Sequence, residues 1–381
     1  MPDQVGGSEE YAVRLLKAVT SDSALEDVSL QKQVSLQLEL AAMKKTRECH
    51  PDLSDIVWHE APWSGHNRLR RVVVESTWLF HRSSGFDIVH HFGGRVPVLH
   101  RGATVVTIHD LQPLDIPENF SAAKRHYLKM ALKHSSRAAD LVVVPSRWVA
   151  ERVEQHFKVP ADHIRVVSST YPQQLFDQLE NQKDRSRRIN PPKKLFKASD
   201  TEDGLWNDKP FVLYPAATYP HKNHALLIAA HSIVRTRIKD AILILTGGNG
   251  RAHSKVNELV GQSPGVVHLG RCDRKLLASL YFSAAAVAFP SRYEGFGLPV
   301  LEAMAAGTPV IAANKTALPE IVGDAGMLVD PDDLDGWVDA ITEVLNRSSD
   351  IDKRVEKART RAALYSPVKA AARLTEVWTR L

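Results

Sequence analysis

Short apolar runs alternate with longer amphipathic stretches along most of the chain. Runs of strand length lie at 87–92, 103–108, 141–144, 164–167, 211–214, 241–245, 266–269, 284–289 and 310–313. Between them, stretches such as 121–137 and 148–157 repeat apolar residues at the spacing of one helix face. The continuous run at 141–144 is typical of a strand buried on both faces of a parallel sheet. This alternation, without hairpin-linked strands, predicts an α/β fold with doubly wound parallel sheets.

The first 60 residues show the alternation less clearly. Gly6 and Gly7 open an amphipathic helix that extends to Val19, and only five residues precede these glycines. We therefore expect no strand before them. Farther along, residues 31–43 favour a helix and residues 56–58 a short strand.

The length of 381 residues allows two domains of typical size. Residues 181–208 differ from the rest of the chain, because lysines and arginines crowd around two prolines and apolar residues are few. We predict a first domain over 1–180, a linker or insertion over 181–209 and a second domain over 210–364. A terminal helical segment over 365–381 completes the chain.

Composition excludes several classes of protein. A net charge of +5 favours anionic ligands or an anionic surface, but a diffuse excess does not indicate nucleic-acid binding. Cys49 and Cys272 are far apart, so neither a disulfide framework nor metal-ligand spacing is expected, which fits a reducing, cytoplasmic compartment. No run of 18 apolar residues predicts a membrane span, and the N-terminal residues lack the apolar core of a signal peptide.

The most informative stretch is 284–313, which is predicted to form a strand, a glycine-bearing loop, a helix and a second strand. Pro299 near the helix start and Gly307 just past its end are the usual boundaries of a helix. Such a loop directs backbone N–H groups and the positive end of a helix dipole toward a phosphate. Glu294 and Glu302 flank the loop with seven residues between them. Because carboxylates repel phosphate, these two suit hydroxyl groups on either side of a diphosphate.

This arrangement resembles the E-x7-E signature of the retaining family-4 glycosyltransferases, the group 1 glycosyl transferases of the GT-B fold. The Gly-Phe-Gly-Leu-Pro sequence inside the motif and the stretch 316–320 strengthen the resemblance. It implies two Rossmann-like domains facing a cleft, with the last helix crossing back to the first domain. It also implies transfer of a hexose from a nucleotide diphosphate sugar to a hydroxyl of a glycan or lipid-linked acceptor, with retained configuration and with neither metal nor cofactor.

The resemblance implies catalytic roles for His109, Lys222 and Glu294. His109 follows a strand end, where open α/β sheets bind ligands, and would orient the donor sugar or the acceptor. Lys222 stands near a helix start and matches the phosphate-binding lysine, while Glu294 would hold the donor sugar. The backbone N–H groups of Gly297 and Leu298 would join Lys222 in stabilising the leaving diphosphate. The implied donor-binding residues are Gly6, Gly7, Gly247, Gly248, Arg271, Gly295, Phe296, Gly297, Leu298 and Glu302.

Two departures from the family leave alternatives open. Most relatives have an arginine where this chain has Ala217, and a strand before the first glycine pair is not evident. His221, His224 and Arg251 are candidates to replace the missing charge. A catalytically degenerate nucleotide-sugar-binding protein is one alternative, and a GT-B epimerase or hydrolase is another.

Two weaker motifs have simpler interpretations. Gly248 and Gly250 follow a strand, but no third glycine or closing acidic residue completes a dinucleotide site, so a cofactor-dependent dehydrogenase is not expected. Asp330 and Asp332 have the spacing of a metal-binding pair, but they precede a helix and suit N-capping better, so no metal is expected.

Residues 121–137 form a predicted helix with a basic stripe. Arg125, Lys129, Lys133 and Arg137 recur at every fourth position, where like charges repel by a few tenths of a kcal/mol per pair. Basic amphipathic helices can lie on anionic lipid, so this helix indicates peripheral association with the inner face of a membrane. A solvated helix face is the alternative.

Overall fold

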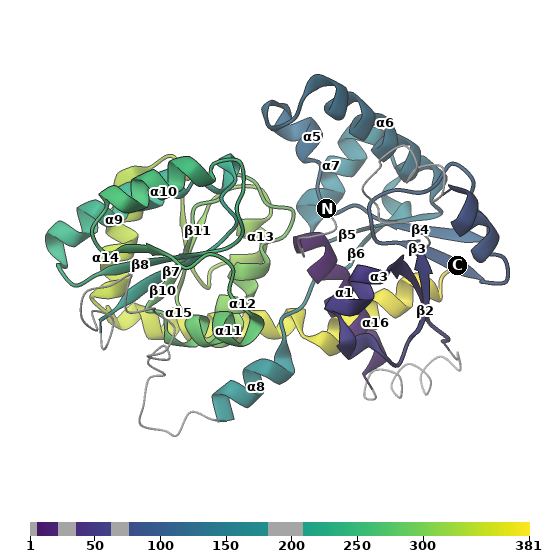
Figure 1. Ribbon diagram of the computed structural model, residues 1–381. Coiled ribbons are helices and arrows are strands. Elements are labelled where there is room, and N and C mark those ends of the chain that lie inside the picture. The colour runs from purple at the N-terminus through teal and green to yellow at the C-terminus, as the bar shows by residue number, and fades with distance from the viewer. Residues whose placement is uncertain (1–5, 22–35, 62–75, 182–208) are drawn as a thin grey trace. The chain divides into compact units, whose positions relative to one another are not determined.

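The computed structural model in Figure 1 describes residues 6–21, 36–61, 76–181 and 209–381. The chain divides into two compact units. Met1–Thr170 and Pro367–Leu381 form the first, and Tyr171–Ser366 forms the second. Each unit is built on a parallel sheet flanked by helices, as the alternating pattern predicted.

The main sheet of the first unit has four strands in the order β3-β4-β5-β6. They are β3 (Ile88–His91), β4 (Ala103–Thr107), β5 (Leu141–Val144) and β6 (Ile164–Val166), all paired in parallel. Every residue of β5 is buried, as expected for the continuous apolar run. These four strands were predicted from the sequence and are confirmed.

Helices cover both faces of this sheet. Val105 and Val143 pack with α1 (Gly7–Thr20) and α16 (Pro367–Trp378). Val106 and Val142 face the other side, toward α6 (Ala122–Ala138) and α7 (Arg147–Phe157). The Ser146 hydroxyl accepts a hydrogen bond of 3.2 Å from the Val149 N–H and caps α7. The short elements α5 (Gln112–Asp115), η2 (Pro117–Asn119) and η3 (Ala161–His163) complete the connections.

A separate two-stranded parallel sheet contains β1 (Glu39–Met43) and β2 (Val57–Ala61), which are joined through α3 (Lys44–Cys49) and η1 (Pro51–Leu53). The strand at β2 was predicted, but the helix predicted over 31–43 is wrong for residues 39–43. Leu40 packs with Trp58 onto Val13 of α1, so pairing with β2 and contact with α1 outweigh local preference. Residues 31–35, and residues 1–5, where no strand was expected, lie outside the described residues.

The second unit contains a six-stranded parallel sheet in the order β12-β11-β10-β7-β8-β9. Its strands are β7 (Phe211–Pro215), β8 (Ile242–Thr246), β9 (Val266–His268), β10 (Ala286–Phe289), β11 (Val310–Ala313) and β12 (Met327–Val329). The chain moves outward from β7 to β9, returns to β10 on the other side of β7, and then moves outward again. The strand order therefore reverses between β7 and β10.

Helices also cover both faces of the second sheet (Figure 1). On one face, α9 (His224–Arg237) packs against α14 (Leu334–Leu345) and α10 (His253–Gln262). The other face carries α11 (Arg274–Ser283), α12 (Leu298–Ala306) and α15 (Ser349–Ala362). The remaining elements are η5 (Pro220–Lys222), α13 (Leu318–Val322) and η6 (Ala363–Tyr365).

The boundary between the units differs from the expectation. The first domain was predicted to end at residue 180, but α8 (Gln173–Asn181) belongs to the second unit. The Phe176 ring lies 5.3 Å from the Phe282 ring of α11, and Leu179 is buried in the same core. Within the predicted terminal segment over 365–381, helix α16 begins at Pro367 and packs on α1.

The predicted capping residue of α14 needs a correction. Asp333 caps this helix, because its Oδ1 accepts a hydrogen bond of 3.0 Å from the Gly336 N–H. Asp330 instead accepts from the Asp332 N–H inside the preceding loop. In the described part of the chain, no helix is long and apolar enough to cross a bilayer.

Candidate functional site

The reversal of strand order between β7 and β10 is where an open α/β sheet ordinarily binds its ligand, beyond the carboxyl ends of the strands. The segment after β7 contains η5 and ends with Lys222. The loop after β10 contains Glu294 and the glycines that precede α12. The Arg292 N–H donates a hydrogen bond of 2.8 Å to the His221 carbonyl and joins the two segments.

Lys222 and Glu294 meet at this reversal although they lie 72 positions apart in the chain. The Lys222 Nζ lies 2.5 Å from the Glu294 Oε1, and the two side chains are only 17% and 13% exposed. The Tyr214 hydroxyl donates to the Lys222 carbonyl, and the Glu294 N–H donates to the Thr316 hydroxyl at 3.0 Å. The backbones of both residues are thus fixed by hydrogen bonds, and their charged side chains meet beyond the carboxyl ends of β7 and β10.

The loop after Glu294 leads into the N-terminus of α12. Gly297 adopts a φ of +113°, and a Cβ there would lie 2.7 Å from the Leu318 Cδ2, so this position favours glycine. The Gly297 carbonyl accepts from the Val300 and Leu301 N–H groups. Within the described residues, the N–H groups of Gly297 and Leu298 donate to no other residue. They remain open to an anion at the positive end of the helix.

Phe296 and Glu302 contribute to this site from the core side. The Phe296 ring is buried against the Tyr365 ring at 5.8 Å and anchors the loop. Glu302 is 6% exposed, and its Oε2 accepts a hydrogen bond of 2.6 Å from the Tyr281 hydroxyl of α11. The carboxylate therefore has a protein partner, and its predicted contact with a ribose stays a prediction.

Gly247 lets the loops after β7 and β8 approach closely. Its φ is +132°, and a Cβ there would lie 2.4 Å from the Ala216 carbonyl oxygen. The Gly247 N–H donates to the Gly270 carbonyl at 2.8 Å, and the Gly248 carbonyl accepts from the Thr218 N–H at 3.1 Å. Arg271 lies on the next loop with an exposed side chain, and its Nε would lie 3.1 Å from a Cβ added at Gly248. The predicted donor-binding residues of these loops thus lie together.

The two histidines beside Lys222 do not replace the missing positive charge. Burial lowers the pKa of His221 to about 4, with a further lowering by Lys222. Burial also lowers the pKa of His224 to about 4. Both rings are therefore neutral at pH 7 in this structure, which argues against the expectation that they compensate for Ala217. Arg251 is exposed on the loop after β8 and remains a candidate.

The first unit carries the other predicted residues. The His109 Nε2–H, just beyond β4, donates to the Phe92 carbonyl at 2.7 Å, and the ring meets the Tyr11 ring edge-on at 5.0 Å. Burial lowers the pKa of His109, so its Nδ1 is an unprotonated acceptor at neutral pH. Gly6 precedes α1 and Gly7 is its first residue, and a Cβ at either position would meet nothing within 4 Å.

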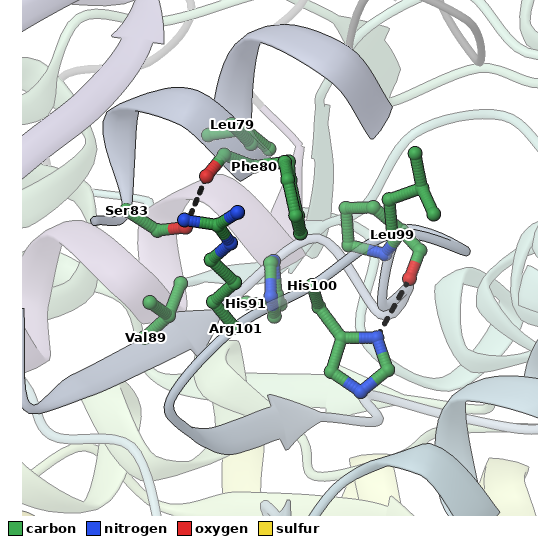
Figure 2. Close-up of a pocket in the computed structure, with 9 residues that line it drawn as sticks. Leu79, Phe80, Ser83, Val89, His91, Leu99, His100 and Arg101 are labelled. Carbon is green, nitrogen blue, oxygen red and sulfur yellow. Dashed lines mark hydrogen bonds between the residues drawn. The ribbon is translucent and has the colours of Figure 1, made fainter.

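A small hollow lies elsewhere in the first unit, between the helix at 76–82 and residues 97–101 (Figure 2). The Arg101 guanidinium covers the Phe80 ring at 3.9 Å from its centroid, and the His100 Nδ1–H donates to the Pro97 carbonyl at 3.2 Å. These side chains leave a volume of about 10 Å³, which holds about one water molecule. No predicted site residue lines this hollow.

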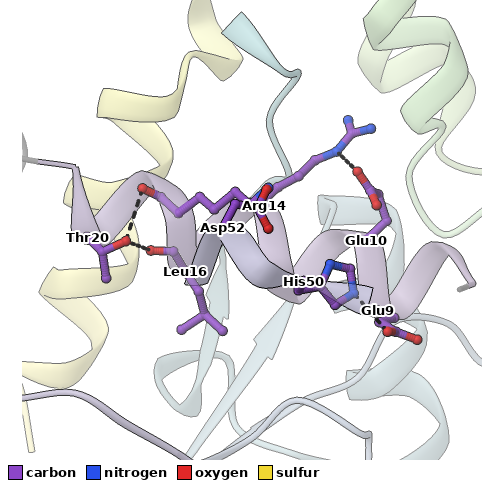
Figure 3. Close-up of polar contacts among 8 residues, drawn as sticks. Glu9, Glu10, Arg14, Leu16, Thr20, His50 and Asp52 are labelled. Carbon is purple, nitrogen blue, oxygen red and sulfur yellow. Dashed lines mark hydrogen bonds and ion pairs between the residues drawn. The ribbon is translucent and has the colours of Figure 1, made fainter. Parts of the chain in front are cut away.

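Polar contacts surround the first turns of α1 (Figure 3). Glu10 pairs with Arg14 at 2.8 Å, and Arg14 also donates to the Thr170 carbonyl at 2.8 Å. Glu9 contacts the buried His50 ring at 2.9 Å. These residues were not singled out from the sequence, because the partners of Arg14 at Thr170 and of Glu9 at His50 lie more than 40 positions away.

Two family models match the chain, and together they cover most of both units. Residues 37–170 match Glycosyltransferase Family 4, and residues 197–361 match Glycosyl transferases group 1. This chain belongs to the group 1 glycosyltransferases of family 4. The predicted family is thereby confirmed, and the second match spans the Lys222 and Glu294 site of this glycosyltransferase.

Several curated relatives share part of the sequence. The O-antigen chain mannosyltransferase B of Escherichia coli is 32% identical over 255 residues, which cover 65% of this chain and 63% of the relative. The O-antigen chain mannosyltransferase RfbU of Salmonella typhimurium is 26% identical over 73% of this chain and 72% of the relative. A D-inositol 3-phosphate glycosyltransferase of Mycolicibacterium smegmatis is 37% identical over 38% of this chain and 34% of the relative. The chain thus spans less than two thirds of the first of these relatives.

Solved structures of similar proteins establish the fold. A glycosyltransferase from Rickettsia africae matches with a TM-score of 0.71 and 18% identity, covering 100% of this chain and 96% of that one. The Anabaena protein Alr3699/HepE, solved in complex with UDP and glucose, matches with a TM-score of 0.73 and 16% identity over 99% and 97% of the two chains. The predicted GT-B fold class is confirmed.

Proposed function

We propose that this glycosyltransferase moves a hexose, mannose-like in character, from a nucleotide diphosphate sugar to a hydroxyl of a glycan or lipid-linked acceptor. We further propose that it retains the anomeric configuration and needs neither metal nor cofactor. The observation that carries the proposal is the meeting of Lys222 and Glu294 beside the open N-terminus of α12. The names of the mannosyltransferase relatives and the UDP and glucose bound to the Anabaena protein support the choice of donor and sugar.

The residues of the second unit would divide the donor between them. Lys222 and the N–H groups of Gly297 and Leu298 would bind the diphosphate and stabilise the charge that grows on it as the sugar leaves. Glu294 would accept hydrogen bonds from sugar hydroxyls once Lys222 turns to the phosphate. Family analogy assigns the acceptor proton to the leaving phosphate, so no side-chain base is required. Because the lysine and the helix dipole supply the positive charge at the diphosphate, no metal is required either.

A donor screen and a transfer assay test this proposal. Thermal shifts with UDP, GDP and ADP sugars would identify the base, and proton NMR of the product would report its anomeric configuration. Transfer should continue in EDTA. Undiminished transfer by both Lys222→Ala and Glu294→Ala would contradict the site assignment.

Ala217 favours a second candidate, a nucleotide-sugar-binding protein without transfer activity, because one positive charge is missing beside the diphosphate. That candidate predicts donor binding with no transfer to any acceptor. A GT-B epimerase or hydrolase would instead consume the donor in the absence of an acceptor, so the assay run both with and without acceptor separates the three.

The basic helix α6 supports peripheral binding to an anionic membrane on the cytoplasmic side. Arg125, Lys129 and Arg137 are exposed, and α6 contains no acidic residue. Tyr127 is 46% exposed and accepts a hydrogen bond of 2.6 Å from Arg95. Met130 is 53% exposed on the same helix. Binding should be salt-sensitive and confined to anionic vesicles, and equal partitioning to neutral vesicles would exclude it.

A further inference from the structure

A pocket of about 360 Å³ lies between α3, η1 and β2 of the first unit, within the roughly 300–1,000 Å³ range of small-molecule sites. Helix α3 contributes Lys44, Arg47 and Glu48, which share one helix face. Strand β2 contributes Trp58 and Glu60, which lie two positions apart in the strand and therefore face the same side. The predicted catalytic residues do not line this pocket.

The charged side chains of the pocket balance one another. The Arg47 Nη1 lies 2.9 Å from the Glu60 Oε1, and the Lys44 Nζ lies 4.0 Å from the Glu48 Oε1. These two cations and two carboxylates sum to a formal charge of zero. The pocket therefore offers many hydrogen-bond donors and acceptors but no excess positive charge that would favour a phosphate. A neutral ligand with several hydroxyl groups matches this lining.

Trp58 adds a fixed aromatic surface. Its indole N–H donates a hydrogen bond of 2.9 Å to the Leu53 carbonyl, and its ring packs in part against the core below the pocket. The ring is half-buried, so part of it remains available to a ligand. A pyranose has an apolar C–H face that packs on an aromatic ring while its hydroxyls bond to charged planar groups around the rim.

His50 also lines the pocket from its buried side. The residue is 1% exposed, and its Nε2–H donates to the Glu9 carboxylate at 2.9 Å (Figure 3). With the proton on Nε2, Nδ1 accepts hydrogen bonds, and it is buried without a partner in the described part of the chain. Glu9 also lies two residues beyond Gly7, which connects the pocket to the glycine pair predicted to bind the donor.

We propose that this pocket binds a neutral hexose unit of a glycan acceptor. The inference rests on the proposed function and deepens it, because it selects an acceptor with a recognised sugar over a bare lipid or a phosphorylated polyol. The Trp58 ring would support the sugar face, and the Arg47 and Glu60 pair would bond to its hydroxyls.

Binding can be measured without transfer activity. Indole N–H signals of the ¹⁵N-labelled full chain would be recorded during titration with methyl α-D-mannopyranoside, methyl α-D-glucopyranoside and methyl α-D-galactopyranoside, and separately with inorganic phosphate. The spectrum of Trp58→Phe assigns the Trp58 signal by its loss. We expect that signal to shift saturably with at least one hexoside and not with phosphate. No shift with any of the three hexosides, or an equal shift with phosphate, would overturn the inference.

Kinetics provide the second readout. Glu60→Gln and Trp58→Leu should each raise the acceptor KM about tenfold, which corresponds to the loss of a contact worth about 1.4 kcal/mol, while the donor KM stays unchanged. Trp58→Phe should restore most of the affinity lost in Trp58→Leu and guards against a folding defect. Arg237→Gln, which breaks the exposed Arg237–Asp339 pair of the second unit at 3.1 Å, is the matched control and should change neither KM.

These two readouts separate the pocket from the proposed function. A saturable shift of the Trp58 indole without transfer to any acceptor would support the pocket and contradict the proposed function. Transfer with an unchanged acceptor KM in Glu60→Gln and Trp58→Leu would contradict the pocket and leave the proposed function standing.

Discussion

Replacement of Lys222 by methionine removes the charge at the β7–β10 reversal and keeps an unbranched side chain of similar length. The Lys222 Nζ lies 2.5 Å from the Glu294 Oε1, and the two side chains are 17% and 13% exposed. Removal of the lysine leaves the Glu294 carboxylate largely desolvated and without this partner. An unsatisfied buried group of this kind costs about 1–3 kcal/mol of unfolding free energy. We expect the lower part of that range, because neither side chain is fully buried.

A double-mutant cycle separates the stability of this pair from its role in transfer. Lys222→Met with Glu294→Gln removes both charges, and the unfolding free energy should return most of the way to that of the wild type. Transfer should not recover. Loss of one electrostatic donor at a developing charge lowers kcat by a factor of about 10²–10³, and the second substitution cannot restore that donor. Stability and activity should therefore diverge in the double variant.

Urea unfolding of the four proteins in the cycle and initial transfer rates with saturating donor provide the two measurements. Additive losses of stability in the double variant would refute the claim that the two side chains depend on each other. Recovery of kcat in the double variant would refute the assignment of Lys222 to the leaving diphosphate, because it would show that the single variant failed through the unpaired glutamate alone.

Three further predictions concern the second unit. Gly247→Ala places a methyl group 2.4 Å from a backbone oxygen at a φ of +132°, and it should lower the unfolding free energy in urea by about 1–3 kcal/mol. The control Gly261→Ala, which has open space in helix α10, should raise the unfolding free energy by about 0.5–1 kcal/mol. Tyr281→Phe removes the hydroxyl that donates to Glu302 at 2.6 Å and should cost about 1.5–3 kcal/mol, and an unchanged urea midpoint would contradict this. Burial lowers the pKa of His231 to about 4, so the unfolded chain binds more protons and stability falls as the pH drops from 6.5 toward 4. His231→Gln should reduce the slope of the unfolding free energy against pH by at most about 1.4 kcal/mol per pH unit. An unchanged slope between about pH 7 and 5 would contradict the lowered pKa of His231 in the folded protein.

The sequence by itself determined the features that depend on neighbouring residues. Strands buried on both faces need continuous apolar runs, and those at β5, β7 and β8 are buried throughout. A helix start and end need particular backbone angles, so Pro299 and Gly307 located α12 correctly. The E-x7-E motif is likewise local, because one loop and one helix carry it, and it was sufficient to predict the family and the GT-B fold.

Only the tertiary structure decided the features that depend on distant partners. Residues 39–43 form β1 because β2 pairs with them, and α8 joins the second unit because its apolar face finds a core there. Neutral rather than charged forms of His221 and His224 follow from burial that no local pattern reveals. The pocket beside Trp58 likewise exists only where α3 and β2 pack together. Desolvation and packing act between segments that the fold brings together, so their consequences cannot be read from spacing along the chain.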